Sequence, residues 1–289
     1  MIKTHQLKLF LLLLLLGGGI SCHAQQFPFF GFYRNIPAFY NPATAGLDYS
    51  FKSNLLYRSQ WTGLEGAPIS YLGQVNARLD RLRSGVGLNV VHDEIGYTQS
   101  TEITGNYNYQ LSMNDNQQKI AFGFAPKFYF SERPTMNVDS SGTGTPTGWE
   151  RTSNFTMNAG AVFKGQKLLL GASVMNILPA KAAFKIPIIY APHTSVMASY
   201  DIRLTEQTTL VPAVHLLTDF NVMSVYLNAR VQHQKLWWQL GYHNRTIIAA
   251  AGYRFLERIN VGYMIEYDVE APIFPHIWSH EVFLAYELK

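Results

Sequence analysis

The sequence predicts an all-β protein: a transmembrane antiparallel β-barrel of about fourteen strands, with a short N-terminal segment folded inward as a plug. Three observations predict this fold. Only 15% of the 289 residues are charged although 47% are hydrophobic, whereas soluble domains carry about 25% charged residues. Apolar and polar residues alternate along most of the chain, and the connections between alternating segments are short and long in turn. Disorder is excluded, because it requires low hydrophobicity and high net charge.

Residues 1–24 predict a secretory signal peptide. Two lysines precede an apolar run at 11–16, and Cys22-His23-Ala24 resembles a small-residue cleavage site. This is the order of regions in a signal peptide, and the apolar core is shorter than the roughly 20 residues that span a bilayer. An alternative places lipid attachment at Cys22, but Gly19 three positions upstream fits lipoprotein processing poorly. The protein is therefore expected to leave the cytoplasm for the outer membrane.

Residues 25–50 are expected to pack inside the barrel or against its periplasmic mouth. The run 27–33 is rich in aromatic residues, whereas disordered segments are depleted in them. Pro37 and Pro42 prevent a regular helix or strand. We therefore expect a plug or periplasmic segment of irregular structure before the first strand.

Residues 51–289 are predicted to form the barrel itself. In the segment 259–268 every odd position is apolar and most even positions are small or polar. Such alternation places apolar side chains on one face of a strand and polar ones on the other. Most alternating segments approach the 9–11 residues of a tilted membrane strand. The predicted strands are 52–61, 69–79, 85–92, 101–111, 119–130, 154–164, 167–176, 193–203, 207–217, 223–233, 235–244, 247–255, 258–268 and 279–288.

The connections give an independent test of this interpretation. Those after even-numbered strands are short, whereas the long ones, which are 62–68, 92–100, 131–153, 176–192 and 269–279, all follow odd-numbered strands. Outer-membrane barrels alternate short periplasmic turns with longer extracellular loops in this way. We expect 131–153 to be a flexible loop of low complexity. The apolar loops 176–192 and 271–275 either contact a partner or fold inward, and the sequence leaves both open.

The sequence predicts no catalytic residue, no cofactor, no metal site and no nucleic-acid binding. Its basic residues are scattered, whereas nucleic-acid binders concentrate them on one face. The single cysteine lies in the predicted signal peptide, and G-x-S-x-G and phosphate-loop motifs are absent. His276 and His280 have the spacing of a helical metal pair, but in an extended chain they lie roughly 13 Å apart.

Two sequence blocks are the candidate functional residues. In the first, Asn41-Pro42-Ala43 favours a turn and Gly46 permits a positive φ, so this block is expected to fix how the N-terminal segment enters the first strand. In the second, Arg58 faces the lumen if Tyr57 faces lipid. We expect Arg58 to join a hydrogen-bond network that braces the plug rather than a ligand site. The candidate residues are Asn41, Pro42, Ala43, Gly46, Arg58, Gln60, Trp61, Gly66 and Pro68.

These blocks resemble the PorP/SprF family of Bacteroidota, which is linked to the type IX secretion system. Further similarity appears at Asp93-Glu94-Ile95-Gly96, at Tyr107-Asn108-Tyr109-Gln110-Leu111 and at Ser279-His280-Glu281-Val282. The resemblance implies an outer-membrane barrel without enzymatic activity that helps secreted proteins, often adhesins, reach or stay on the surface. Its implied partners are outer-membrane lipid, the secretion machinery and secreted surface proteins. The alternative is a transporter for hydrophobic compounds, because fatty-acid channels also resemble a barrel with an N-terminal plug.

Overall fold

The computed structural model describes residues 29–113, 118–138, 144–178, 180–182, 184, 188–269 and 278–288. These ranges include most of the predicted barrel and the predicted plug segment from residue 29 onward. The predicted signal peptide, the tip of the predicted loop 131–153, the apolar stretch 271–275 and His276 lie outside the described residues.

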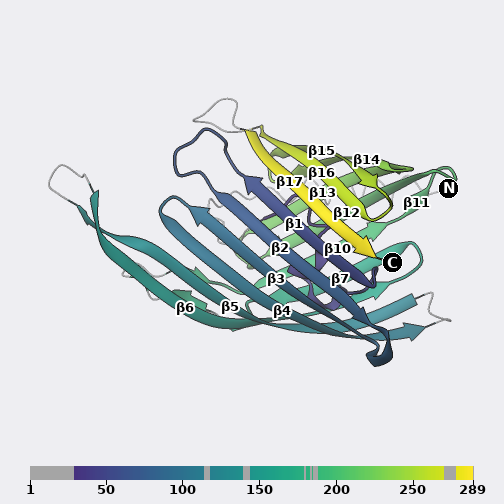
Figure 1. Cartoon of the computed structure of the whole chain (residues 1–289), viewed down its shortest axis with the longest axis horizontal. Coiled ribbons are helices and arrows are strands. Elements are labelled where there is room, and N and C mark those ends of the chain that lie inside the picture. Colours follow the sequence, from purple (N-terminus) through teal and green to yellow (C-terminus); the bar gives the residue numbers. More distant parts are fainter. Residues whose placement is uncertain are drawn as a thin grey trace.

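Among the described residues, fourteen antiparallel strands close into a barrel (Figure 1). Strand β1 pairs with β17, and β10 pairs with β12, so the ring has no open edge. The predicted fold class is confirmed. The ring strands are β1 (Phe51–Ser59), β2 (Ile69–Leu79), β3 (Ser84–Ile95), β4 (Thr98–Met113), β5 (Gln118–Val138), β6 (Gly144–Lys164), β7 (Leu168–Met175), β10 (His193–Tyr200), β12 (Thr208–Thr218), β13 (Met223–His233), β14 (Leu236–His243), β15 (Thr246–Phe255), β16 (Ile259–Asp268) and β17 (Trp278–Leu288).

Three short strands complete the description. Strand β11 (Ile202–Arg203) pairs with β12 just beyond the end of β10. Strands β8 (Ala180–Ala182) and β9 (Ile188–Tyr190) pair only with each other, in the connection between β7 and β10. The helices found in the described ranges are α2 (Pro37–Tyr40) and the 3-10 turns η1 (Pro42–Thr44) and η2 (Asp80–Leu82). None of them has the length and hydropathy that a bilayer-crossing helix requires.

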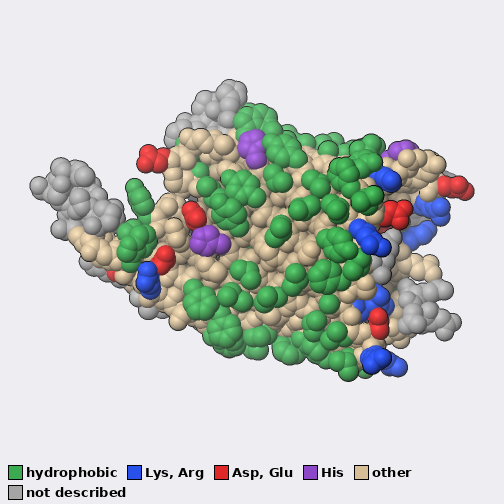
Figure 2. Space-filling model, in the orientation of Figure 1, with side chains coloured by type: hydrophobic (Ala, Val, Ile, Leu, Met, Phe, Trp, Pro, Cys, Tyr) green, Lys and Arg blue, Asp and Glu red, His purple; other side chains and the backbone are tan. Residues whose placement is uncertain are grey.

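The burial pattern of the strands is that of a membrane barrel. Along β4, Ile103, Tyr107 and Leu111 are exposed, whereas Thr104 and Asn108 between them are buried. Figure 2 shows apolar side chains across the middle of the outer surface, with charged side chains gathered toward the ends. Apolar residues outside and polar residues inside suit a barrel whose outer wall meets lipid. The alternation in the sequence therefore reflects the outward and inward faces of the barrel wall.

Two of the predicted long connections are wrong. The predicted loop 92–100 is a tight turn at Gly96 and Tyr97, because β3 continues to Ile95 and β4 begins at Thr98. The predicted loop 131–153 is mostly a hairpin, because β5 reaches Val138 and β6 begins at Gly144. Strand pairing depends on backbone hydrogen bonds, so it continues where the alternation of apolar side chains ends. In Figure 1 this hairpin projects beyond the rest of the barrel.

The connections define two ends of the barrel. At one end, short turns connect each even-numbered predicted strand to the next odd-numbered one. Examples are η2 between β2 and β3, and residues 165–167 between β6 and β7. At the other end lie residues 60–68, the β5–β6 hairpin and the β7–β10 connection. We call these the short-turn end and the long-loop end. The alternation predicted from the sequence holds, although two of the long connections are shorter than expected.

Candidate functional site

The candidate site lies where residues 29–50, here called the plug, cross the lumen. Asn89 of β3, Tyr226 of β13 and Glu281 of β17 all bond to plug residues, so the plug touches widely separated parts of the wall. The plug runs toward the start of β1 at the short-turn end (Figure 1). Its apolar side chains form the main core cluster with inward residues of the wall. The largest fully buried plug side chains are Phe30, Phe32, Ile36, Phe39 and Tyr40.

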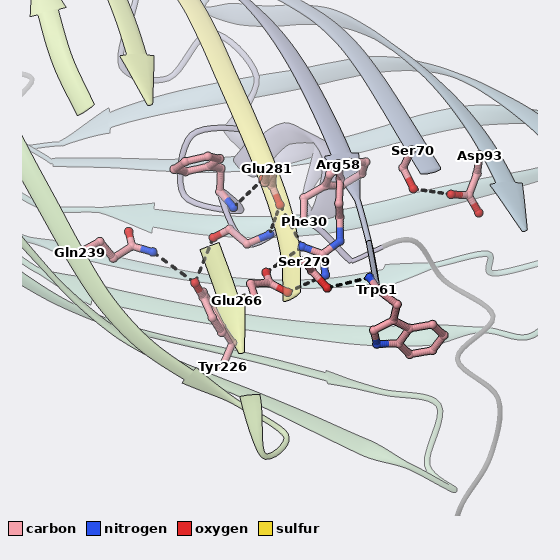
Figure 3. Close-up of polar contacts among 12 residues, drawn as sticks. Phe30, Arg58, Trp61, Ser70, Asp93, Tyr226, Gln239, Glu266, Ser279 and Glu281 are labelled. Carbon is pink, nitrogen blue, oxygen red and sulfur yellow. Dashed lines mark hydrogen bonds and ion pairs between the residues drawn. The ribbon is translucent and has the colours of Figure 1, made fainter. Parts of the chain in front are cut away.

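A buried charged group, here called the Arg58 cluster, holds the beginning of the plug (Figure 3). Arg58 on β1 binds Glu266 on β16 through two bonds of 2.7 Å and binds Glu281 on β17 at 3.2 Å. Glu281 also accepts the backbone N–H groups of Gly31 and Phe32, at 2.9 and 3.0 Å. Paired, hydrogen-bonded charges of this kind are stable in a buried site, whereas an unpaired one is not. The cluster therefore ties the plug to the strands that close the ring.

Arg58 faces inward as the sequence predicts, because it is buried while Tyr57 is exposed. Its register explains the contact: Arg58 lies directly opposite Glu281 in the β1–β17 ladder. The sequence singled out Arg58 but missed Glu266 and Glu281. The signal that marks them is a glutamate at an inward position of an alternating strand.

The Asn41-Pro42-Ala43 block forms a fully buried turn against the opposite wall. Asn41 Nδ2 donates to the carbonyl oxygens of Ala161 and Ala172, at 3.0 and 3.2 Å, and Asn41 Oδ1 accepts the N–H of Ala43 at 3.0 Å. Pro42 occupies the first position of η1, where its missing N–H costs no hydrogen bond. One amide side chain thus caps the turn and fastens it to β6 and β7.

Glycines allow this turn to approach the wall closely. A Cβ atom added at Gly123 of β5 would lie 2.5 Å from the amide nitrogen of Ala43. Gly46 has a φ of +63°, and a Cβ there would lie 2.5 Å from the carbonyl oxygen of Ala77. Only glycine adopts this conformation and this approach without strain. Gly46 lies shortly before the start of β1, and its role in leading the chain into that strand stays a prediction.

The remaining candidate residues lie at the long-loop end, away from the Asn41 turn. Strand β1 ends at Ser59, earlier than predicted, so Gln60 and Trp61 begin the loop. The Gln60 N–H donates to the carbonyl of Pro68, and the Trp61 N–H donates to Ser279 Oγ at 3.1 Å. The carbonyl of Gly66 accepts the N–H of Gly96. These residues close the first loop, and the structure does not bring them to the plug.

A second charged group lies on the wall formed by β4 and β5. Lys127 Nζ pairs with Glu102 at 2.8 Å and also contacts the hydroxyl of Tyr129. Tyr129 stacks on Tyr190 of β9 at a ring distance of 4.2 Å. The connection between β7 and β10 therefore folds inward at this point, which is one of the two outcomes that the sequence left open.

The buried carboxylates of the site are engaged by neighbouring cations. Within the described ranges, no three His, Cys, Asp or Glu side chains are placed to hold one metal ion. Glu266 and Glu281 are both engaged by Arg58, and Glu102 by Lys127. The charged groups instead hold the plug and neighbouring strands together.

Comparison with known proteins gives matches of two kinds. The family model for type IX secretion system membrane protein PorP/SprF matches residues 22–286. A Pseudomonas aeruginosa FadL homologue has a similar fold, with a TM-score of 0.53, 11% identity, and coverage of 87% of this chain and 94% of its own. The P. putida toluene transporter TodX gives a TM-score of 0.52 at 10% identity, with coverage of 86% and 92%. No curated protein sequence matches significantly.

The structural similarities, at this identity, establish the barrel fold alone. The family match covers nearly the whole chain, plug and barrel together. With the apolar outer band, it assigns the protein to the outer membrane as a component associated with secretion. The chain belongs to the PorP/SprF family of type IX secretion system membrane proteins.

Proposed function

We propose that the protein is a non-enzymatic accessory of type IX secretion, which helps particular secreted proteins, such as adhesins, to reach or stay on the cell surface. The observation that carries this proposal is the family match over residues 22–286. The buried plug supports it, because a lumen crossed by residues that pack against the wall is suited to anchoring rather than to passage. Outer-membrane lipid surrounds the wall, and the secretion machinery and its secreted proteins are the proposed partners.

The β5–β6 hairpin is our candidate contact region on the cell surface. Strand β5 pairs with β4 only as far as Glu132. Strand β6 pairs with β7 only from Ala159 onward, and one further backbone bond joins Ile177 to Met157. Beyond those points the two strands pair with each other, supported by the ion pair between Arg151 and Glu132 at 2.9 Å. Free strand edges offer backbone N–H and C=O groups to an added strand. A secreted protein with an exposed strand is therefore the expected partner of this hairpin.

Lumen chemistry favours this proposal over the transport of hydrophobic compounds. A compound crossing the barrel would meet the Arg58 cluster on one wall and the Lys127–Glu102 pair on the other. Binding pockets for apolar ligands are lined mainly by hydrophobic and aromatic side chains. Uptake of an apolar compound that is lost on gene deletion, with lipid retained in the purified lumen, would favour the transporter instead.

Gene deletion with complementation tests the function. Proteins on intact cells and in the medium are compared by mass spectrometry in the parent, the deletion strain and the complemented strain. We expect at least one large secreted protein to leave the cell surface on deletion and to return on complementation. If every secreted and surface protein keeps its normal place and amount in the deletion strain, the proposed function is wrong.

A hairpin variant tests the contact region separately. Residues 134–149 are replaced by Asn-Gly, which joins the paired residues Arg133 and Glu150 by a two-residue turn. We expect this variant to assemble in the outer membrane but to lose surface attachment of the dependent protein. The matched control is Phe220→Ser, which alters an exposed residue of a different loop at the same end. If the dependent protein still attaches normally to cells with the shortened hairpin, the hairpin is not the contact region.

A further inference from the structure

A cavity of about 780 Å³ lies between the plug and the short-turn end of the barrel. Its walls come from the plug and from the ends of strands on both sides of the ring, including Lys52 of β1, Lys164 of β6 and Arg254 of β15. The volume lies within the range of about 300–1,000 Å³ typical of ligand sites. Because short turns of outer-membrane barrels are periplasmic, the cavity opens toward the periplasm. We call it the periplasmic vestibule.

Three of its cations are already paired with carboxylates. Lys52 pairs with Glu287 at 3.1 Å, and Arg254 reaches the other oxygen of Glu287 at 3.5 Å. Lys164 pairs with Asp48 at 3.0 Å. These pairs hold the plug and the strand ends together and leave those carboxylates engaged. They are therefore part of the wall of the vestibule.

Arg34 and Arg230 differ from those three, because their partners within the described ranges are neutral. Arg34 Nη1 donates to the carbonyl of Val211 at 3.5 Å. Arg230 donates to Asn35 Oδ1 at 2.7 Å and to Gln239 Oε1 at 3.0 Å. No described carboxylate lies within 4.0 Å of either guanidinium. Two positive charges thus line the vestibule without a direct ion pair to a described carboxylate.

The two arginines lie close to each other, and the guanidinium of Arg230 is held in a fixed orientation. Val211, which accepts from Arg34, lies directly opposite Arg230 in the β12–β13 ladder. The guanidinium of Arg230 lies over the ring of Trp237 at 4.3 Å, which fixes its plane. Burial lowers the pKa of Arg34, although the charge of Asp201 opposes this shift. A carboxylate is the natural complement, because guanidinium groups bind it through two parallel hydrogen bonds.

We propose that the periplasmic vestibule is a binding site for an acidic peptide segment of a periplasmic partner, with Arg34 and Arg230 receiving its carboxylates. This inference deepens the proposed function, because it names the residues and the charge interaction through which the barrel would contact the secretion machinery. It rests on the proposed function only for the statement that the partner belongs to that machinery. The rest of the wall suits a peptide backbone, since amide and hydroxyl groups pair with its N–H and C=O groups. These include Asn35, Gln74, Asn76, Thr209, Gln232 and Asn260.

A peptide fits the vestibule better than a lipid does. The strand ladder that surrounds the vestibule is closed, including the β10–β12 pairing, so the cavity has no side entrance from the bilayer. Asp201 and Glu206 also line the vestibule and repel anions of either kind, so they do not distinguish a peptide from a lipid headgroup. An extended peptide segment enters along the barrel axis and therefore needs no entrance from the bilayer.

Fluorescence anisotropy with the purified full-length mature protein in detergent tests the site. The probe is a labelled hexapeptide, Gly-Ser-Asp-Glu-Asp-Glu, and the matched peptide replaces its acidic residues with Asn and Gln. We expect the acidic peptide to bind at least tenfold more tightly, and its affinity to fall as salt is raised. Arg34→Gln is the main variant, because Arg34 makes one long hydrogen bond and its loss is least disruptive. It is expected to weaken binding about tenfold, as is Arg230→Gln.

The matched control is Arg81→Gln, which removes an exposed arginine at the same end but outside the vestibule. It should leave peptide binding unchanged. Equal binding of the acidic and amide peptides, or equal binding by Arg34→Gln and the wild type, would overturn the proposal. Binding of inorganic phosphate or anionic lipid micelles with no binding of the peptide would also overturn it. Because the assay measures direct binding, its failure is distinct from a failure of surface attachment in the deletion strain.

Discussion

Single side chains attach the plug to the barrel wall, and Arg58 is the most important of them. Its guanidinium binds both Glu266 and Glu281, and Glu281 in turn accepts two backbone N–H groups of the plug. Removing Arg58 would leave two buried carboxylates without their cation. The plug and the closing strands of the ring therefore depend on the same residue.

Arg58→Leu is expected to destabilise the protein by about 3–5 kcal/mol, the usual cost of breaking a buried ion pair. The measurement is the temperature at which the purified barrel loses its compact form on an SDS gel, together with protease cleavage within the plug. Arg151→Leu breaks an Arg–Glu pair in which the arginine is 75% exposed, and it should cost less than about 1 kcal/mol. Equal effects of the two substitutions would show that the Arg58 cluster does not hold the plug.

Asn41 offers a second test at this scale, because the nitrogen and the oxygen of its side-chain amide bond to different parts of the protein. Asn41→Asp keeps the oxygen that accepts the N–H of Ala43 but loses the donor to Ala161 and Ala172. We expect Asn41→Asp to be at least as destabilising as Asn41→Ala, by about 2–4 kcal/mol, since it places an acceptor against two carbonyl oxygens. The same gel measurement decides this. If Asn41→Asp destabilises the protein only slightly while Asn41→Ala destabilises it strongly, then only the hydrogen bond from the Ala43 N–H to the Asn41 side chain contributes to stability.

At the scale of elements, the sequence predicts well those strands whose two faces differ. The segment 259–268 coincides with β16 because lipid and lumen impose the alternation on its whole length. The outer halves of β5 and β6 escape prediction, because both of their faces lie beyond the apolar band while their backbones still pair. Arg58 is predictable from its position in one strand. Glu266 and Glu281 also stand at inward positions, but no local pattern shows that they meet Arg58, because β1 pairs with β17 from the other end of the chain.

The contact between the plug turn and the wall is also an element-scale feature, and Gly123 tests it. Gly123→Ala places a methyl group 2.5 Å from the backbone of Ala43, so the turn or strand must move, at a cost of about 1–3 kcal/mol. Gly105→Ala makes the same change in β4, where nothing lies within 4 Å of the added methyl group. We expect only Gly123→Ala to lower the gel transition temperature and expose the plug to protease. Comparable losses in both variants would point to a general intolerance of the strands to alanine.

At the scale of the whole molecule, the plug and the inward β7–β10 connection make the barrel a closed body with one face to the periplasm and one to the exterior. The Arg58 cluster holds the plug on one side of the lumen, and the Asn41 turn holds it on another. Tyr190 packs on Tyr129 nearer the long-loop end. Contacts at the two ends of the barrel are therefore separated by the plug and by its attachments to the wall.

This closure predicts that the wild-type protein conducts no ions as an open pore in planar bilayers. Arg58→Leu and Gly123→Ala loosen the plug at two independent places, so each should give intermittent openings, and the double variant should open more often than either alone. Gly105→Ala should remain as silent as the wild type, since its added methyl group reaches no plug atom. Steady wild-type conductance would contradict the closed lumen. Silence of the double variant, with its plug shown by protease to be displaced, would mean that the β7–β10 connection alone seals the barrel.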